Sequence, residues 1–261
     1  MTHWNVSKEQ STASSSLKRA AIVVIACLAV AGLVVGINYL AGSNTIPAAQ
    51  ADQMNAQAQA EVRKIEAENE AAATARRTVF IGDSYSQGTG ASDKSKRWTS
   101  IVSKALDWHE VNLARGGTGY LKESTSGCGR PKCLNYVAMV PEAVGTNPGR
   151  VVVAGGQNDF SLDIAEVGPM IEKTYADLRA ALPNATIIAI GPSTIGDITP
   201  KIIEYDAKVQ AAAAAVGAQY ISLIDPDPID KSMAAPDGVH VNDDGHAAIA
   251  AAVQNELNSR A

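Results

Sequence analysis

Two short polar segments of the chain carry a serine, a histidine and a carboxylate, the three groups that together can make a hydroxyl nucleophilic. Ser84 lies in Gly-Asp-Ser-Tyr-Ser, and Asp237 and His240 lie much later in Pro-Asp-Gly-Val-His. A histidine can take the serine proton when a carboxylate holds its ring in the required tautomer. These residue types predict that Ser84 attacks a carbonyl group, that His240 acts as base and then acid, and that Asp237 orients His240.

Each of these residues also has an interpretation without catalysis. Ser84 is typical of a turn or a helix N-cap, and Asp237 and His240 are typical of a surface turn before a helix. A metal site that adds Asp243 and His246 is less favoured, and His246 is expected on a helix surface. The sequence around Ser84 lacks the second glycine of the Gly-x-Ser-x-Gly elbow. That absence argues against the α/β-hydrolase fold but not against a nucleophilic serine.

A third polar segment, Gly-Gly-Gln-Asn-Asp at residues 155–159, follows an apolar run. Its Asn158 is a candidate oxyanion donor, because a side-chain NH₂ can stabilise the negative charge that develops on an attacked carbonyl oxygen. A turn residue bonded to nearby backbone is the alternative. The glycine-rich loop at residues 112–120 can bring backbone N–H groups close to a ligand. This loop lacks the lysine and the glycine spacing of a phosphate-binding loop, which argues against phosphate binding.

Regular elements must hold these polar segments, and the chain from residue 78 onward alternates strand and helix signals. Asp163 with Glu166, and Thr199 with Pro200, have the spacing of helix starts. The alternation predicts a parallel sheet with helices on both faces. Polar segments that follow strands would then meet at the carboxyl edge of that sheet. The expected strands are residues 78–81, 111–113, 150–154, 186–190 and 219–224.

Taken in order, the polar motifs of the chain resemble the four signature blocks of the SGNH (GDSL) hydrolases. The resemblance covers the chain from residue 78 to residue 257 and implies a flavodoxin-like, three-layer α/β fold of about five parallel strands. It implies acyl transfer through a serine, with no cofactor and no metal. The matching blocks are Gly82-Asp83-Ser84, Gly117, Gly156-Gln157-Asn158-Asp159 and Asp237-Gly238-Val239-His240.

The resemblance also assigns the oxyanion hole and supports the same three catalytic residues. It implies that the hole is formed by the backbone N–H groups of Ser84 and Gly117 and by the side chain of Asn158. Gly117 is chosen over Gly116 because the family places this glycine five residues after an asparagine, which here is Asn112. The resemblance does not extend to the chain before residue 78.

The composition excludes one class of partner and disfavours one class of substrate. A net charge of −5 and a pI near 5.4 argue against nucleic-acid binding, which needs a clustered basic face. Aromatic residues make up 5% of the chain, which disfavours a large aromatic-lined pocket for a long acyl chain.

The N-terminal part of the chain has the pattern of a membrane anchor. Residues 20–40 contain no charged side chain and are long enough to cross a bilayer. We expect a single-pass anchor over residues 20–41. The positive-inside rule places the basic tail, residues 1–19, in the cytoplasm and everything after the anchor outside. A signal peptide cleaved near residues 49–51 and a lipoprotein site at Cys27 are the alternatives.

Residues 42–77 are expected to form a solvated helical stalk or linker. Ala, Gln and Glu dominate this segment, and these are strong helix formers. Its sizeable apolar residues are too few for a convincing coiled-coil seam. Weak coiled-coil dimerisation through the stalk is the alternative.

Cys128 and Cys133 form a close pair in Cys-Gly-Arg-Pro-Lys-Cys. In an oxidising exterior such a pair is typical of a disulfide that closes a small loop. A zinc site would need two further ligands at suitable spacing, and the sequence offers none. Because the loop follows the Gly117 segment, we expect it near the site.

Together these patterns predict a membrane-anchored, extracytoplasmic serine esterase whose hydrolase domain spans residues 78–261. Its expected partner is an ester substrate, such as an acylated carbohydrate or a lipid, and deacetylation of cell-surface carbohydrate is the leading expectation. A lipase or thioesterase and an acyltransferase are alternatives from the same family, since all share an acyl-enzyme. A surface-binding module that has lost activity is the alternative from another class.

Overall fold

The computed structural model of the chain describes residues 32–39, 41, 46–126, 128 and 131–260. It divides into two compact units, Met1–Ala72 and Ala73–Ala261, and each is described by itself. In the first unit residues 32–39 are helical. The helix α2, Ala48–Arg76, begins in the first unit and ends in the second. No helix within the described ranges is long and apolar enough to cross a membrane. The expected tail and most of the expected anchor lie outside those ranges.

The second unit is built on a five-stranded sheet in which all neighbouring strands are parallel, in the order β2-β1-β3-β4-β5. This is the flavodoxin-like strand order, and the predicted α/β fold with a five-stranded parallel sheet is confirmed. The strands are β1 (Arg77–Gly82), β2 (His109–Asn112), β3 (Arg150–Ala154), β4 (Thr186–Ile190) and β5 (Gln219–Ile221).

The two edge strands differ from the expected bounds. β2 spans His109–Asn112, whereas the apolar run at residues 111–113 predicted a later start. An edge strand that is partly solvated tolerates polar side chains, so the strand extends beyond the apolar run. β5 ends at Ile221 and does not continue to residue 224. The chain turns there, with the Ser222 hydroxyl accepting hydrogen bonds from the backbone N–H groups of Ile224 and Asp225.

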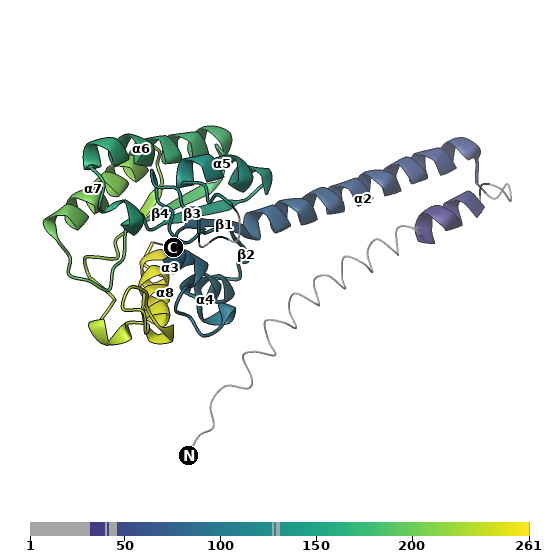
Figure 1. Cartoon of the computed structure of the whole chain (residues 1–261). Helices are drawn as coiled ribbons and strands as arrows, with labels where there is room; N and C mark the ends of the chain where they lie inside the picture. Colours follow the sequence, from purple (N-terminus) through teal and green to yellow (C-terminus); the bar gives the residue numbers. More distant parts are fainter. Residues whose placement is uncertain (1–31, 40, 42–45, 127, 129–130, 261) are drawn as a thin grey trace, which may run out of the picture. The chain divides into compact units, whose positions relative to one another are not determined.

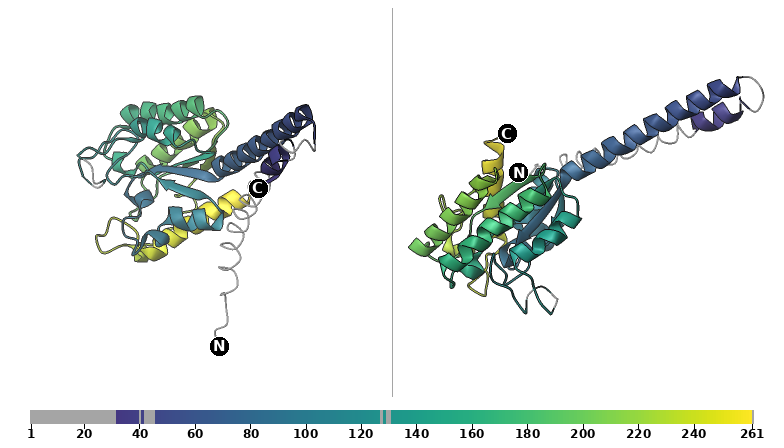
Figure 2. Two further views of the ribbon diagram at one scale, coloured as in Figure 1. Left: turned by 90° about the vertical axis from the view of Figure 1, so that its right-hand side faces the viewer. Right: turned by 90° about the horizontal axis from the view of Figure 1, so that it is seen from above.

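Side chains that alternate along the central strands supply two separate hydrophobic cores. Val79 and Val151 point to one face of the sheet, while Phe80 and Val152 point to the other. The first face is covered by α5 (Tyr136–Gly145), α6 (Ile164–Ala181) and α7 (Pro200–Ala215), and the second by α4 (Trp98–Ala105) and α8 (Asp243–Asn258), as Figure 1 and the views in Figure 2 show. Near-continuous apolar runs are therefore expected in β1, β3 and β4, because both faces of these strands are buried.

The helix starts follow local capping chemistry. The Asp163 carboxylate accepts a hydrogen bond from the N–H of Ala165 at the start of α6, and the Thr199 hydroxyl caps α7, whose first residue is Pro200. Both predicted caps are confirmed. The last helix is capped by Asn242. Short turns of helix complete the fold: α3 (Ser84–Gln87), η1 (Lys94–Lys96), η2 (Gln157–Asp159) and η3 (Lys231–Met233).

Candidate active site

A cavity of about 500 Å³ lies where the loops after β1, β2, β3 and β4 meet. Its lining residues include Ser84, Gly117, Asn158 and His240. The chain runs from β1 outward to β2 and then returns to β3 on the other side of β1, so the cavity lies at the point where the strand order reverses. Open α/β sheets bind ligands at such a point. The structure thus brings the candidate residues of four separate segments together.

Asp237 and His240 form a hydrogen-bonded pair within one turn. The Nδ1 atom of His240 lies 2.7 Å from Oδ2 of Asp237. The other carboxylate oxygen accepts the backbone N–H groups of Val239 and His240, each at 2.9 Å. These hydrogen bonds, that of the His240 N–H foremost, hold the pKa of Asp237 well below its usual range. Asp237 is therefore ionised and holds His240 with Nε2 free to face the cavity.

Ser84 is the first residue of α3, directly after β1. The Asp83 carboxylate caps this single turn by accepting the N–H of Tyr85 at 3.0 Å. The Tyr85 hydroxyl donates to the carbonyl oxygen of Val239 at 2.8 Å, which ties the serine segment to the histidine segment. Burial raises the pKa of Tyr85 to about 12, so this donor stays protonated. Ser84 and His240 line the same cavity without a direct hydrogen bond between these two described residues; in free enzymes this contact often closes when substrate binds.

The two further oxyanion candidates are linked to each other. The Asn158 side-chain nitrogen donates one hydrogen bond to the carbonyl oxygen of Thr118 at 3.0 Å, next to Gly117. This leaves its second N–H for a ligand. The Gly116 N–H is already bonded to the Gln87 side-chain oxygen at 2.9 Å, which supports Gly117 as the residue that presents a backbone N–H. Gly117 has φ of 77°, in the region that favours glycine.

Two buried carboxylates beside these residues were missed as functional residues by the sequence analysis. Asp83 accepts hydrogen bonds from the Gly156 N–H, the Gln157 amide and the Tyr136 hydroxyl. Its neighbour in space, Asp159, accepts from the backbone of residues 120–122 and from a tyrosine hydroxyl. Both side chains are fully buried. The sequence signal for Asp83 is its position directly after the buried strand β1, and the signal for Asp159 is its position before a loop. The hydrogen-bond partners of both carboxylates come from distant segments.

We expect Asp83 to make stability fall as the pH rises through about 6. Burial raises its pKa from 3.8 to about 6, against the hydrogen bonds that lower it. The folded state therefore binds more protons than the unfolded state between these values, and stability from this group is present below pH 3.8 and lost above about 6. A pKa raised by about 2 corresponds to about 3 kcal/mol. Urea unfolding of wild type and Asp83→Asn from pH 4 to 7 measures how the free energy of unfolding depends on pH in each protein. An equal decline in both proteins would contradict this assignment.

His246 is not on a helix surface, so that expectation is wrong. It is fully buried in α8, with Nε2 3.2 Å from the carbonyl oxygen of Thr89, because its helix packs this face against the segment that follows α3. Burial lowers the pKa of His246. Asp243 accepts hydrogen bonds from Ser92. Of the four residues of the less favoured metal site, Asp237 and His240 are therefore bonded to each other, while Asp243 and His246 bond to Ser92 and Thr89.

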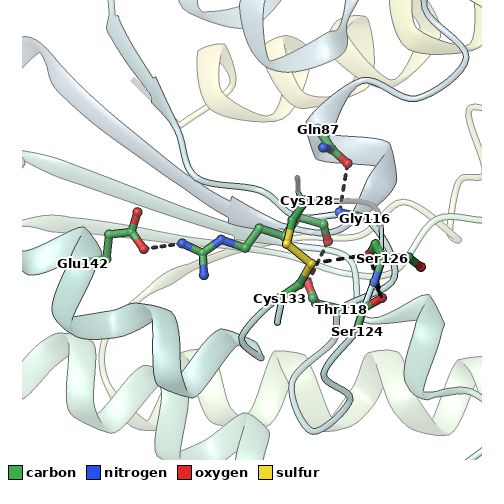
Figure 3. The surroundings of a disulfide bond; sticks show 9 residues. Gln87, Gly116, Thr118, Ser124, Ser126, Cys128, Cys133 and Glu142 are labelled. Atoms are coloured by element: carbon green, nitrogen blue, oxygen red, sulfur yellow. Dashed lines mark hydrogen bonds and ion pairs between the residues drawn. A yellow bond between two sulfur atoms is a disulfide. The ribbon is translucent and has the colours of Figure 1, made fainter. Parts of the chain in front are cut away.

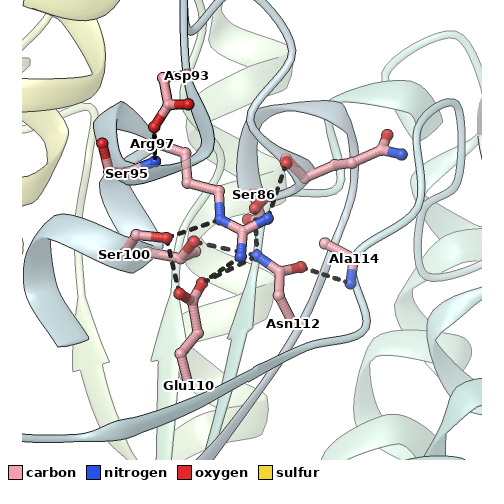
Figure 4. A network of polar contacts seen from close by, with 10 residues as sticks. Ser86, Asp93, Ser95, Arg97, Ser100, Glu110, Asn112 and Ala114 are labelled. Carbon is pink, nitrogen blue, oxygen red and sulfur yellow. Dashed lines mark hydrogen bonds and ion pairs between the residues drawn. The ribbon is translucent and has the colours of Figure 1, made fainter. Parts of the chain in front are cut away.

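Asn112 lies in a polar network that holds the end of α3 (Figure 4). Its side-chain nitrogen donates to the carbonyl oxygen of Ser86 at 2.8 Å, and its oxygen accepts the N–H of Ala114. Beside it, Arg97 and Glu110 form an ion pair of 3.0 Å with both side chains mostly buried. The network joins the nucleophile segment to the start of the glycine-rich loop.

Cys128 and Cys133 are joined by a disulfide beside the glycine-rich loop (Figure 3). Cys133 pairs with Ser124 through two antiparallel backbone hydrogen bonds of 2.7 and 3.0 Å, and residues 124–126 and 131–133 are called the hairpin below. A Cβ atom placed on Gly117 would lie 2.7 Å from the Ser124 hydroxyl oxygen, so this hairpin packs directly on Gly117. Ser126, inside the same hairpin, lines the cavity. The hairpin therefore forms part of the wall of the site.

Loss of the disulfide is expected to lower stability and to change activity. A bridge with a sequence separation of 5 closes a short loop, for which chain entropy gives about 2 kcal/mol. Denaturant unfolding of a Cys128→Ser/Cys133→Ser variant measures the first effect, and its ester hydrolysis the second, because Gly117 loses a packed neighbour. Unaltered kinetics in this variant would argue against a role for the hairpin in shaping the site.

Comparison with known proteins shows the family to which this chain belongs. The model of the GDSL-like lipase/acylhydrolase family matches residues 80–248, and the chain belongs to that family. The protein is accordingly an ester-hydrolysing serine hydrolase. No curated protein matches the chain by sequence.

Solved structures match the fold of this chain at low sequence identity. TesA is 20% identical, with a TM-score of 0.57 over 70% of this chain and 98% of its own. An M. smegmatis aryl esterase is 14% identical, with a TM-score of 0.53 over 70% of this chain and 99% of its own. The salicylyl-acyltransferase SsfX3 of a tetracycline biosynthetic pathway is also 14% identical, with a TM-score of 0.56 over 70% of this chain and 54% of its own. At these identities the likeness concerns the fold.

Proposed function

We propose that this family member hydrolyses esters through a triad of Ser84, His240 and Asp237. The observation that carries the proposal is the Asp237–His240 pair, with its 2.7 Å contact, on the same cavity as Ser84. A charged carboxylate on Nδ1 stabilises the imidazolium that forms when Nε2 takes a proton. The oxyanion hole is assigned to the N–H groups of Ser84 and Gly117 and to the Asn158 amide.

The reaction proceeds in two halves. Ser84 Oγ forms a bond to the ester carbonyl carbon while its proton passes to Nε2 of His240. The carbonyl oxygen gains the negative charge and is held by the oxyanion donors. The bond to the leaving alcohol then breaks, and His240 returns the proton to that alcohol. Water, activated by His240, releases the acyl group from Ser84 by the same steps.

The proposed substrate is a short acyl ester of a carbohydrate, such as an acetylated cell-surface polysaccharide. Besides Ser84, Tyr85 and Thr89, the cavity lining includes Ser126, Ser193 and Thr194, whose hydroxyl groups suit a hydroxylated alcohol. A lipase or thioesterase would need a longer apolar channel. An acyltransferase remains a second candidate because one protein of the same fold is a salicylyl-acyltransferase and the acyl-enzyme would be shared.

The test of the substrate class is hydrolysis of p-nitrophenyl acetate and p-nitrophenyl octanoate by the purified full chain. A higher kcat/KM for the acetate is expected. A preference for octanoate would support a lipase or thioesterase. No turnover of either ester would support the acyltransferase or a binding module without activity.

We also propose that residues 20–41 anchor the protein in a membrane, that residues 1–19 face the cytoplasm, and that a stalk over residues 42–77 carries the hydrolase domain outside. The charge-free segment and the basic residues before it support this orientation, and a disulfide fits an oxidising exterior. Protease added to right-side-out membrane vesicles should release the esterase activity. Full protection of that activity would oppose the proposed orientation.

A further inference from the structure

The one-turn helix α3 contacts the glycine-rich loop through its last residue. Gln87 is half-buried, lines the cavity, and accepts the Gly116 N–H on its side-chain oxygen at 2.9 Å (Figure 3). Ser84 begins the same helix. One turn of helix therefore carries the nucleophile at one end and a hydrogen-bond acceptor for the loop at the other.

The loop that Gln87 contacts is a tight turn whose two central residues are both glycine. The Arg115 carbonyl oxygen accepts the Thr118 N–H at 3.4 Å and the Thr118 hydroxyl at 2.8 Å. The Arg115 N–H is bonded to the Gly82 carbonyl oxygen at 2.8 Å, and the Thr118 carbonyl oxygen accepts from Asn158 at 3.0 Å. Both ends of the turn are thus fixed, while glycine on both sides of the central Gly116–Gly117 peptide leaves this plane free to rotate.

Gln87 is itself held firmly enough to orient such a peptide. The Ser86 carbonyl oxygen accepts from Asn112 at 2.8 Å (Figure 4). The Gln87 carbonyl oxygen accepts from Arg97 at 3.5 Å. Arg97 is in turn paired with Glu110. A hydrogen bond donated by the Gly116 N–H to an acceptor anchored in this way selects one orientation of the Arg115–Gly116 peptide.

We propose that Gln87 is a positioning residue. It holds the Arg115–Gly116 peptide through the Gly116 N–H, and so limits the rotation of the following Gly116–Gly117 peptide and directs the Gly117 N–H toward the oxyanion. The inference rests on the proposed oxyanion hole and adds to it a residue outside the family motifs. Without the Gln87 acceptor, the Gly116–Gly117 peptide samples orientations in which its N–H points away from the developing charge. Substrate binding is little affected, because the oxyanion forms only after attack.

The test uses Gln87→Met, which removes the acceptor while nearly preserving size and shape, and Gln87→Leu as a second variant without an acceptor. For p-nitrophenyl acetate we expect kcat to fall about tenfold with KM almost unchanged, a loss of about 1.4 kcal/mol. Affinity for phenylboronic acid, whose adduct with serine mimics the tetrahedral intermediate, should fall in parallel. Gln254→Met, the same change at a half-buried glutamine in α8, is the matched control and should retain both values.

The outcomes separate this inference from the proposed function. Asn158→Ala should lower kcat by about 10²–10³ if the assigned hole operates. If it does so while both Gln87 variants keep wild-type kcat and boronic acid affinity, the role of Gln87 is overturned and the hole stands. A rise in KM alone in the Gln87 variants also overturns it, because that indicates a contact with the substrate. If Asn158→Ala has no effect, the proposed hole itself is wrong.

Discussion

Ser84→Ala is expected to lower kcat for p-nitrophenyl acetate by about 10⁴–10⁶-fold. The Ser84 oxygen is the atom that forms the covalent bond in the proposed reaction, and the alanine side chain offers no replacement. What remains is the rate that the oxyanion donors supply to direct attack by water. Steady-state kinetics of the purified full chain measure the loss. The free energy of unfolding should change by less than about 0.5 kcal/mol, because the half-buried Ser84 side chain borders the cavity rather than a packed core.

Ser86→Ala is the matched control for this prediction. Ser86 belongs to the same Gly-Asp-Ser-Tyr-Ser segment and lies in the same helix, but it is 1% exposed and does not line the cavity. Its variant should retain most of the wild-type kcat. Turnover that survives in Ser84→Ala, or an equal loss in both variants, would show that Ser84 is not the nucleophile.

Asp237→Asn should reduce kcat by about 10⁴-fold, the second largest effect. The asparagine oxygen can still accept the N–H groups of Val239 and His240, which preserves the turn. Its NH₂ group, however, replaces the oxygen that lies 2.7 Å from Nδ1 of His240. Nδ1 must then act as an acceptor, so the imidazole carries its proton on Nε2 and cannot take one from Ser84.

The control for this substitution is Asp244→Asn, which removes a carboxylate from the exposed first turn of α8, close to His240 in the sequence. It should leave kcat close to that of wild type, since Asp244 is exposed and does not line the cavity. A pH–rate profile of both variants at constant ionic strength completes the measurement. A small effect of Asp237→Asn, within tenfold of its control, would remove Asp237 from the triad.

Much of the fold was predictable because the central strands have a simple physical requirement. β1, β3 and β4 are buried on both faces, so their sequences are apolar runs that no solvated element would carry. The caps at Asp163 and Thr199 were predictable for the same local reason, since each side chain bonds its own helix. The edge strands β2 and β5 were misplaced by a few residues, because an edge strand is defined by its backbone pairing and not by apolar side chains.

The candidate site divides along the same line between local and distant interactions. The Asp237–His240 pair could be inferred from sequence, because three residues of spacing in a turn suffice to bring the two side chains together. The choice of Gly117 over Gly116 gained its physical support from Gln87, which the chain places in a different segment. A glutamine four residues after a glycine–aspartate pair has no sequence signature of such a role.

The sequence by itself determined the chemistry available to this protein: a serine, a histidine with its carboxylate, an amide and a glycine, each placed after a strand or in a turn. Only the tertiary structure decided how these groups are held. The burial of His246 and the donors gathered by Asp83 and Asp159 depend on contacts between segments far apart in the chain. Such contacts follow from how helices and loops pack over the sheet, and the helix and strand propensities of the residues do not predict them.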